Sequence, residues 1–281
     1  MKYILLLLIS TYLFSQPLNS SITTYYENKN FNASVQKDDS VVYGVGAAIN
    51  YENSQYKLTY EYGDTNTKQP PLSEDLKTEK LFLKYGYTFN DTFKANINYI
   101  NIINDNIAIT DNGRAYGAGL TYNIGKKVSL NCTQFYTDYE DFDVYQSDFK
   151  IAFKTNLDSV KLKLSSITKK IKIDEKNVNS FTKNAEDDYL TTGLKVNASY
   201  KTYHFGGGVY FGKRAFAIMD DGFKIQHHAM EFDRTYSVGV GKTISDIVLR
   251  MQYVYQRATE LPASNEDVEA KVIRLLASYK F

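Results

Sequence analysis

The sequence has little of several residue types, and each shortage narrows the kinds of protein it can encode. Its 281 residues include one cysteine, Cys132, no tryptophan, four prolines and three histidines. A single cysteine excludes an internal disulfide, and its place on an apolar strand face predicts packing rather than chemistry. The formal net charge is +1. Nothing in that balance indicates nucleic-acid binding or a general attraction to membrane surfaces.

The only long apolar run lies at the start of the chain. The segment MKYILLLLISTYLF combines a lysine with a short apolar stretch and is followed by Ser15 and Gln16. It is too short to span a bilayer as a helix, and it predicts a secretory signal peptide over residues 1–20, cleaved near residues 15–20. Residues 21–281 hold no second run of helix-spanning length. The mature chain is therefore expected to enter a membrane, if it does, as strands.

What the sequence has in abundance is tyrosine, at 25 residues, and alternation of apolar with other positions. Examples are Tyr43-Val45-Ala47-Ile49-Tyr51, Tyr56-Leu58-Tyr60-Tyr62 and the terminal Ile273-Leu275-Ala277-Tyr279-Phe281. A period of two predicts strands with one apolar face. Counting from a first strand near Phe31–Gln36 yields about fourteen strands. The stretch SITTYYENKNFNASVQ leaves open whether one long strand or an irregular lead-in comes first.

The expected connections alternate between two lengths. The tight ones are 52–55, 90–92, 125–127, 156–158, 201–202 and 244–245, and the long polar ones are 64–77, 102–113, 138–143, 170–188, 213–232 and 258–267. Soluble sandwiches have no reason to gather long loops at one end, whereas transmembrane barrels have short periplasmic turns and longer extracellular loops. The predicted fold is an all-β, antiparallel up-and-down transmembrane barrel over residues 21–281. Stretches 176–187 and 220–228 are then expected to be reachable from outside the cell.

Aromatic residues gather beside the tight connections. They are Tyr51, Tyr56, Phe89, Phe93, Tyr122, Tyr200, Tyr203, Tyr279 and Phe281. Rings with one polar and one apolar end settle at the level of lipid headgroups, so this set predicts a periplasmic girdle in contact with outer-membrane lipid. Cross-strand pairing in a soluble sheet is the alternative explanation.

The signal segment, the alternation and the terminal Tyr279-Lys280-Phe281 resemble a Gram-negative outer-membrane β-barrel protein. By strand count and length the chain is similar to the monomeric fourteen-stranded porins. That resemblance implies location in the bacterial outer membrane and passive uptake of small hydrophilic solutes. It also implies that the barrel-assembly machinery recognises the C-terminal aromatic, so that Phe281 and Tyr279 form an assembly signal.

Strand positions that face the lumen by alternation carry more cations than acids. Lys84, Lys150, Lys195, Arg250 and Arg274 lie near mid-strand, and the inward acids are Glu61 and Asp148. A barrel with common strand ends would gather the five cations into one belt, whose field a low-dielectric wall focuses on anions. A wall that is simply in contact with water explains why these residues are polar, but it does not explain why positive charges outnumber negative ones. We therefore predict that these residues line the pore and that the solutes are small anions.

The sequence predicts no enzyme, cofactor or metal site. No serine and acid accompany His204 at the spacing of a catalytic triad. Adjacent His227 and His228 point to opposite sides of an extended chain, which disfavours metal binding. The connection 213–232 is expected to form a hairpin at Asp221-Gly222. Its apolar residues Phe216, Ile218, Phe223 and Ile225 either extend the wall or fold inward as a constriction.

Two functions remain open from the sequence. One is a diffusion channel that prefers anions. The other is a non-conducting structural or adhesive barrel that binds partners through its extracellular loops. Conductance in planar bilayers separates the two.

Overall fold

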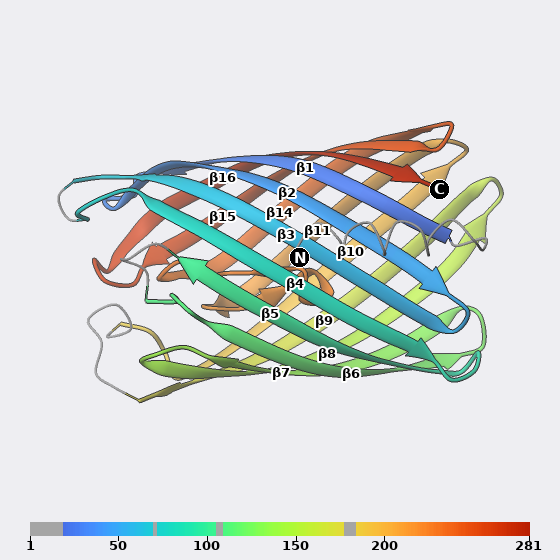
Figure 1. The fold of residues 1–281 in the computed structure, drawn as a ribbon, viewed down its shortest axis with the longest axis horizontal. Helices are drawn as coiled ribbons and strands as arrows, with labels where there is room; N and C mark the ends of the chain where they lie inside the picture. The colour runs from blue at the N-terminus through green and yellow to red at the C-terminus, as the bar shows by residue number, and fades with distance from the viewer. Residues whose placement is uncertain (1–18, 70–71, 105–108, 177–183) are drawn as a thin grey trace, which may run out of the picture.

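The computed structural model describes residues 19–69, 72–104, 109–176 and 184–281. Their main element is a closed antiparallel barrel whose strands neighbour one another in chain order (Figure 1). The barrel strands are β1 (Asn19–Asn32), β2 (Lys37–Tyr51), β3 (Ser54–Thr67), β4 (Leu76–Thr88), β5 (Phe93–Asn104), β6 (Arg114–Ile124), β7 (Val128–Asp138), β8 (Phe142–Leu157), β9 (Val160–Glu175), β10 (Asp188–Tyr200), β11 (Tyr203–Arg214), β14 (Met230–Ile244), β15 (Ile247–Glu260) and β16 (Asn265–Lys280). The predicted fold class and strand number are confirmed.

The first strand lies earlier in the chain than the sequence pattern placed it. β1 covers Asn19–Asn32, and residues 33–36 form the turn into β2, so a first strand at Phe31–Gln36 is wrong. β1 closes the barrel because it pairs with β2 on one side and with β16 on the other, in the register Ser21↔Lys280 to Asn32↔Glu269. The predicted signal peptide falls largely on residues 1–18, which lie outside the described residues.

The two ends of the barrel differ, as the connection lengths predicted. The turns at 52–53, 89–92, 125–127, 158–159, 201–202 and 245–246 lie at the end where β16 finishes (Figure 1). At the opposite end the connections at 139–141 and 261–264 are short, although long loops were expected over 138–143 and 258–267. The reason is strand length: β8, β9 and β16 have 16 residues each. About 9–11 residues span a bilayer, so these strands continue beyond it as paired hairpins.

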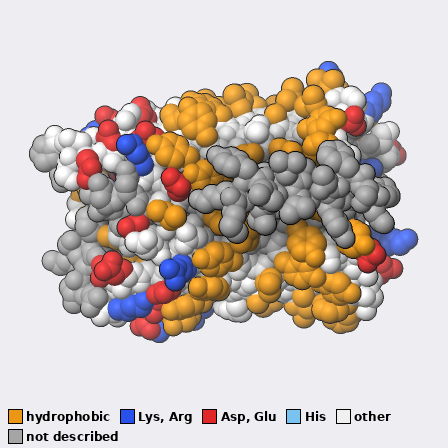
Figure 2. All heavy atoms as spheres, in the orientation of Figure 1, with side chains coloured by type: hydrophobic (Ala, Val, Ile, Leu, Met, Phe, Trp, Pro, Cys, Tyr) orange, Lys and Arg blue, Asp and Glu red, His pale blue; other side chains and the backbone are white. Residues whose placement is uncertain are grey.

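The outer wall is apolar. Outward side chains such as Ile97 (59% exposed), Leu120 (50%) and Val238 (57%) belong to a large set of exposed hydrophobic residues. Figure 2 shows these side chains gathered toward the short-turn end, with charged side chains crowding the long-connection end. All nine aromatics of the predicted periplasmic girdle are exposed. None of the described residues forms a helix of the length and hydropathy needed to cross a bilayer.

Inside the barrel, the half nearer the long connections holds an apolar core. It contains inward side chains of several strands, among them Phe82, Ile100, Phe142, Ile171 and Tyr189. Along β9, the apolar residues therefore switch from the outer face of the barrel to the inner face. Leu164 is exposed on the outer wall, whereas Ile167, Ile171 and Ile173 are buried inside. The inner apolar face is covered by a segment of the chain itself, which forms the candidate site.

Candidate pore and its constriction

Residues 215–229, between β11 and β14, fold into the barrel and are called the inward loop below. The loop contains β12 (Ile218–Met219), a 3₁₀ turn (Asp220–Gly222) and β13 (Lys224–Ile225), and β12 pairs with β13 (Figure 1, orange). The predicted turn at Asp221-Gly222 is confirmed. Phe216, Ile218 and Ile225 are almost fully buried in the inner core. Of the two expected arrangements, the loop therefore folds inward and does not extend the wall.

This arrangement corrects one topological expectation. The stretch 220–228 was expected to be reachable from outside, yet Ile225, His227 and His228 are 3%, 6% and 9% exposed. Apolar side chains of the loop gain more by covering the inner wall than by facing water. The stretch 176–187 lies partly outside the described residues, and Lys176 and Asp187 at its two ends are exposed.

Strands β8 and β9 hold one side of the inward loop. The Gln146 side chain donates to the Ile218 carbonyl oxygen at 2.7 Å and accepts from the Ile218 N–H at 2.8 Å, as a neighbouring strand would. Lys169, 1% exposed, donates to the same carbonyl at 2.9 Å and forms an ion pair with Asp148. Because burial strengthens such contacts and makes their loss costly, this side of the loop is firmly fixed.

The opposite wall, β1 and β16, holds the other side of the loop through Glu27. Lys224 of the loop lies 3.2 Å from Oε1 of Glu27, and Arg274 of β16 forms an ion pair with the same carboxylate. Lys29 lies 3.2 Å from it as well. Glu27 itself is 2% exposed. Three cations thus share one buried carboxylate, and the inward loop extends from one wall of the lumen to the other.

The tip of the inward loop presents two acids to the wall. Asp220 accepts a hydrogen bond from Lys195 at 2.9 Å. Asp221 accepts from Lys150 at 2.7 and 2.9 Å, and its carbonyl oxygen accepts from Lys84 at 2.8 Å. The Lys195 ammonium holds the pKa of Asp220 well below its usual range. Both aspartates adopt positive φ, 50° and 56°. Non-glycine residues seldom adopt such a backbone, which here aims the acids at the cations.

The structure brings most of the predicted pore residues to this constriction. Lys84, Lys150 and Lys195 contact the loop tip, and Arg274 contacts Glu27, whereas Arg250 forms no ion pair with any described residue. The two predicted acids face inward but are covered. Glu61 (5% exposed) pairs with Lys80 at 3.3 Å, and Asp148 (4%) pairs with Lys169. Most of the five predicted cations thus contact an acid or a carbonyl oxygen, whereas the sequence pattern predicted that acids would offset only part of their charge.

Several residues at the constriction were not foreseen. Glu27 was missed because the first strand was placed too late, and alternation along SITTYYENKNF would have revealed it. Asp220 and Asp221 were placed in an external loop, so their charge was not counted in the lumen. Lys80 and Lys169 lie where strands continue past the expected bilayer and apolar residues face inward. The hydrophobic pattern alone gives no signal for that inversion.

Three cavities lie along the barrel wall, and residues of the inward loop line two of them. One of 410 Å³ is lined by Lys84, Lys94, Lys150 and Lys163 and by the acids Glu52, Asp148 and Asp221. A second of 320 Å³ is lined by Lys195 and Arg250 with no acid in its wall. A third of 110 Å³ lies between the loop and β1, β14, β15 and β16. The second and third share Lys195, Ser237 and Gln252, so they adjoin along one wall.

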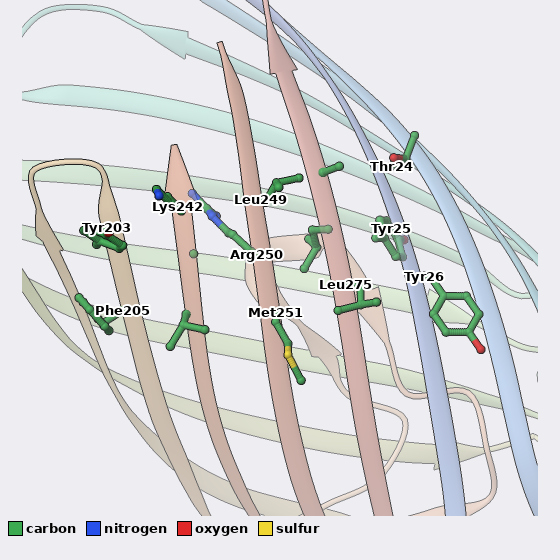
Figure 3. A pocket seen from close by; sticks show the side chains of 14 residues that line it. Thr24, Tyr25, Tyr26, Tyr203, Phe205, Lys242, Leu249, Arg250, Met251 and Leu275 are labelled. Atoms are coloured by element: carbon green, nitrogen blue, oxygen red, sulfur yellow. The ribbon is translucent and has the colours of Figure 1, made fainter. Parts of the chain in front are cut away.

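A separate depression lies on the wall formed by β1, β11, β14, β15 and β16 (Figure 3). Its exposed members Leu249, Met251 and Leu275 alternate with Arg250 and Leu276 of the inner face. Because the wall is one strand thick, both faces contribute to the lining. The apolar members face the region of lipid, so this depression is not part of the pore.

The C-terminus closes the seam between β16 and β1. The Phe281 N–H donates to the Ser20 carbonyl oxygen at 3.0 Å. The rings of Tyr279 and Phe281 lie edge to face, 4.9 Å between centroids, and are 46% and 62% exposed. Two outward rings beside the closing seam suit lipid contact. Their role as an assembly signal stays a prediction.

The described residues offer little catalytic chemistry. His204 lies in the lumen between Ser199 and Thr243, at 3.1 and 2.8 Å, without an acid beside it. No group of three or more His, Cys, Asp or Glu in the described part of the chain is placed to hold a metal ion. His227 and His228 stack with 4.2 Å between ring centroids.

Comparisons with known proteins agree with this geometry. The sequence matches no protein-family model and no curated protein. The structure is similar to the CymD monoaromatic hydrocarbon channel (TM-score 0.59, 11% identity, 94% of this chain and 88% of that chain). It is also similar to the Ralstonia pickettii toluene transporter TbuX (0.56, 9%, 95% and 90%) and to Acinetobacter baumannii Omp33 (0.53, 10%, 95% and 100%).

The chain has the fold of Gram-negative outer-membrane β-barrels. The closed antiparallel barrel with an apolar outer wall is the fold that it shares with these neighbours. At identities of 9–11%, the similarity shows that the fold is shared and gives no information on which solute this chain binds or transports.

Proposed function

We propose that this barrel lies in the bacterial outer membrane, that it is a channel for passive diffusion of small hydrophilic solutes and that it prefers anions. The observation that carries the proposal is the pair of adjoining cavities along β10, β11, β14, β15, β16 and β1. Their walls carry charged and polar side chains among apolar ones and lie beside a loop that narrows the lumen without replacing any barrel strand. Charged and polar side chains along a lumen are what a hydrated solute needs in order to pass a constriction.

The charges along that wall support the preference for anions. The cations of the two cavities are Lys29, Lys195, Arg214, Lys224, Arg250 and Arg274, and the acids are Glu27 and Asp220. Burial lowers the pKa of His227 and His228 well below the usual range, so both rings add no charge at neutral pH. A cationic wall of low dielectric constant raises the local concentration of anions.

The opposite side of the inward loop contributes less to this preference. Lys84 and Lys150 contact Asp221, and three acids line the cavity there with four cations. The proposed anion route therefore follows one side of the lumen. This refines the expectation of a uniform belt, in which all five predicted cations act alike.

Conductance of the folded protein in planar bilayers tests the proposal. We expect discrete steps of current and, in a potassium chloride gradient, a reversal potential on the chloride side. Heat-unfolded protein is the control. Folded barrels that insert and carry no current would contradict the channel and favour the adhesive barrel. A potential on the potassium side would contradict only the preference for anions.

A charge reversal tests which residues set the preference. Arg250 lines the cationic wall and forms no ion pair with a described residue. Arg250→Glu should therefore move the reversal potential toward potassium without disturbing the loop contacts. Lys126→Glu, on the exposed turn between β6 and β7, is the matched control and should leave the potential unchanged. Equal shifts in both variants would contradict the proposed route.

A further inference from the structure

The 110 Å³ cavity between the inward loop and the wall has a feature that the channel proposal does not use. Four buried polar atoms of three residues in its lining have no hydrogen-bond partner: Nε and Nη1 of Arg214, Oε1 of Gln226 and Nδ1 of His228. Arg214 is 0% exposed, and Gln226 and His228 are each 9% exposed. A buried polar group without a partner costs about 1–3 kcal/mol, and more if it is charged. Three residues with such atoms in the lining of one cavity therefore lower the stability of the folded protein.

Arg214 lies beside two aromatic rings and forms no ion pair with a described residue. Its guanidinium carbon lies 5.4 Å from the centroid of the Tyr210 ring and 5.6 Å from that of Phe232. Its Nη2 donates to the Thr235 hydroxyl. The two rings and the Thr235 hydroxyl orient the guanidinium, and two of its nitrogens keep hydrogens to donate.

The other cations of the cavity are already engaged. Lys29, Lys224 and Arg274 share Glu27, and Lys195 pairs with Asp220. Both carboxylates that line the cavity are thereby used. Within the described part of the chain, Arg214 has no carboxylate within ion-pair distance, so an ion pair of the usual kind does not explain its position.

We propose that this cavity binds a small organic anion that carries a carboxylate and a hydroxyl or amino group. Arg214 only donates hydrogen bonds, so it requires acceptor oxygens on the ligand. The side-chain oxygen of Gln226 only accepts, so it requires a donor hydrogen on the ligand. Nδ1 of His228 takes either role according to its tautomer. A short hydroxy acid or amino acid meets these requirements together.

The size and walls of the cavity restrict the ligand further. At 110 Å³ it is well below the about 300–1,000 Å³ of sites for drug-sized ligands. Phe31 and Phe232 supply apolar walls beside the polar atoms. The site is argued from the cavity alone, and only the further step, that the bound anion is also a transported solute, rests on the proposed function.

Calorimetric titration of the folded, detergent-solubilised full chain in chloride-free buffer tests the site without requiring conduction. The probes are glycolate, which has both groups, acetate, which lacks the hydroxyl, and inorganic phosphate. We expect glycolate to bind at least about tenfold more tightly than acetate, because acetate leaves the Gln226 oxygen unpaired. No heat with glycolate, equal binding of acetate, or tighter binding of phosphate would overturn the proposal.

Two variants assign the binding to these residues. Arg214→Gln should weaken glycolate binding at least about tenfold, and Gln226→Leu should remove the difference between glycolate and acetate. Arg234→Gln is the matched control, since Arg234 is an exposed arginine of the adjoining strand β14 outside the cavity lining. If Arg214→Gln does not fold, as judged by heat-modifiable migration, Arg214→Lys replaces it. Unchanged glycolate affinity in the folded Arg214 variant would overturn the proposal, even if the channel conducts.

Discussion

The ammonium group of Lys150, on strand β8, donates to both carboxylate oxygens of Asp221, 71 residues later in the chain, at 2.9 and 2.7 Å. This contact joins the barrel wall to the tip of the inward loop. The Asp221 carboxylate also offsets the charge of Lys150. Strand alternation predicts only the lysine at this position, because Asp221 belongs to a loop. The charge that the lumen presents thus depends on this loop as well as on the strands.

Asp221→Asn is expected to strengthen the preference for anions. The change removes a negative charge beside Lys150 and Lys84 and leaves both ammonium groups in the lumen. We expect the chloride-to-potassium permeability ratio, measured from reversal potentials in planar bilayers, to rise about twofold or more. Asp246→Asn, on an exposed short turn, is the control. A shift toward potassium would show that Asp221 does not act on the permeating ion.

Lys169→Met is expected to destabilise the barrel. Lys169 and Asp148 are 1% and 4% exposed, so the change leaves a buried carboxylate without its cation. Breaking one partner of a buried pair costs about 3–5 kcal/mol of the free energy of unfolding. Urea unfolding in detergent micelles measures the loss. The double change Lys169→Met with Asp148→Leu should recover much of it, and a double variant as unstable as the single one would contradict the pairing.

Thiol labelling on intact cells should distinguish the two barrel ends and the inward loop. In a Cys132→Ser background, a membrane-impermeant maleimide should label Asp187→Cys. It should miss Asn53→Cys on a short turn and Ile225→Cys in the inner core, which is 3% exposed in the wild type. All three should react after denaturation. Labelling of Asn53→Cys alone would reverse the sidedness, and labelling of Ile225→Cys would mean that the loop leaves the lumen.

Deletion of Phe281 should impair assembly severalfold, measured as the fraction of heat-modifiable barrel in the outer membrane. The deletion removes an outward ring and the N–H that donates to Ser20 across the closing seam. Phe281→Tyr keeps both and is the control. Normal assembly of the deletion variant would refute the role of the C-terminal aromatic.

Much of the architecture follows from local pattern. Outward residues such as Leu58, Leu120 and Val238 alternate along their strands because one face meets an apolar medium, and the period of two records that face directly. Strand number, closure in chain order and the two kinds of barrel end could all be predicted from it. The inward direction of Lys84, Lys150 and Lys195 follows from the same alternation.

The sequence by itself therefore determined the barrel, its apolar outer wall and the inward direction of strand residues such as Lys84, Lys150 and Lys195. Only the tertiary structure decided what those side chains meet in the lumen. The pairs Lys150–Asp221, Lys195–Asp220 and Arg274–Glu27 join segments 71, 25 and 247 residues apart. No local period encodes such contacts, because the first two depend on where the inward loop packs and the third on the closing pairing of β1 with β16. The packing of the loop depends on apolar residues that face inward where the strands continue beyond the bilayer. There the outer face of the wall meets water and the inner face is covered by the loop.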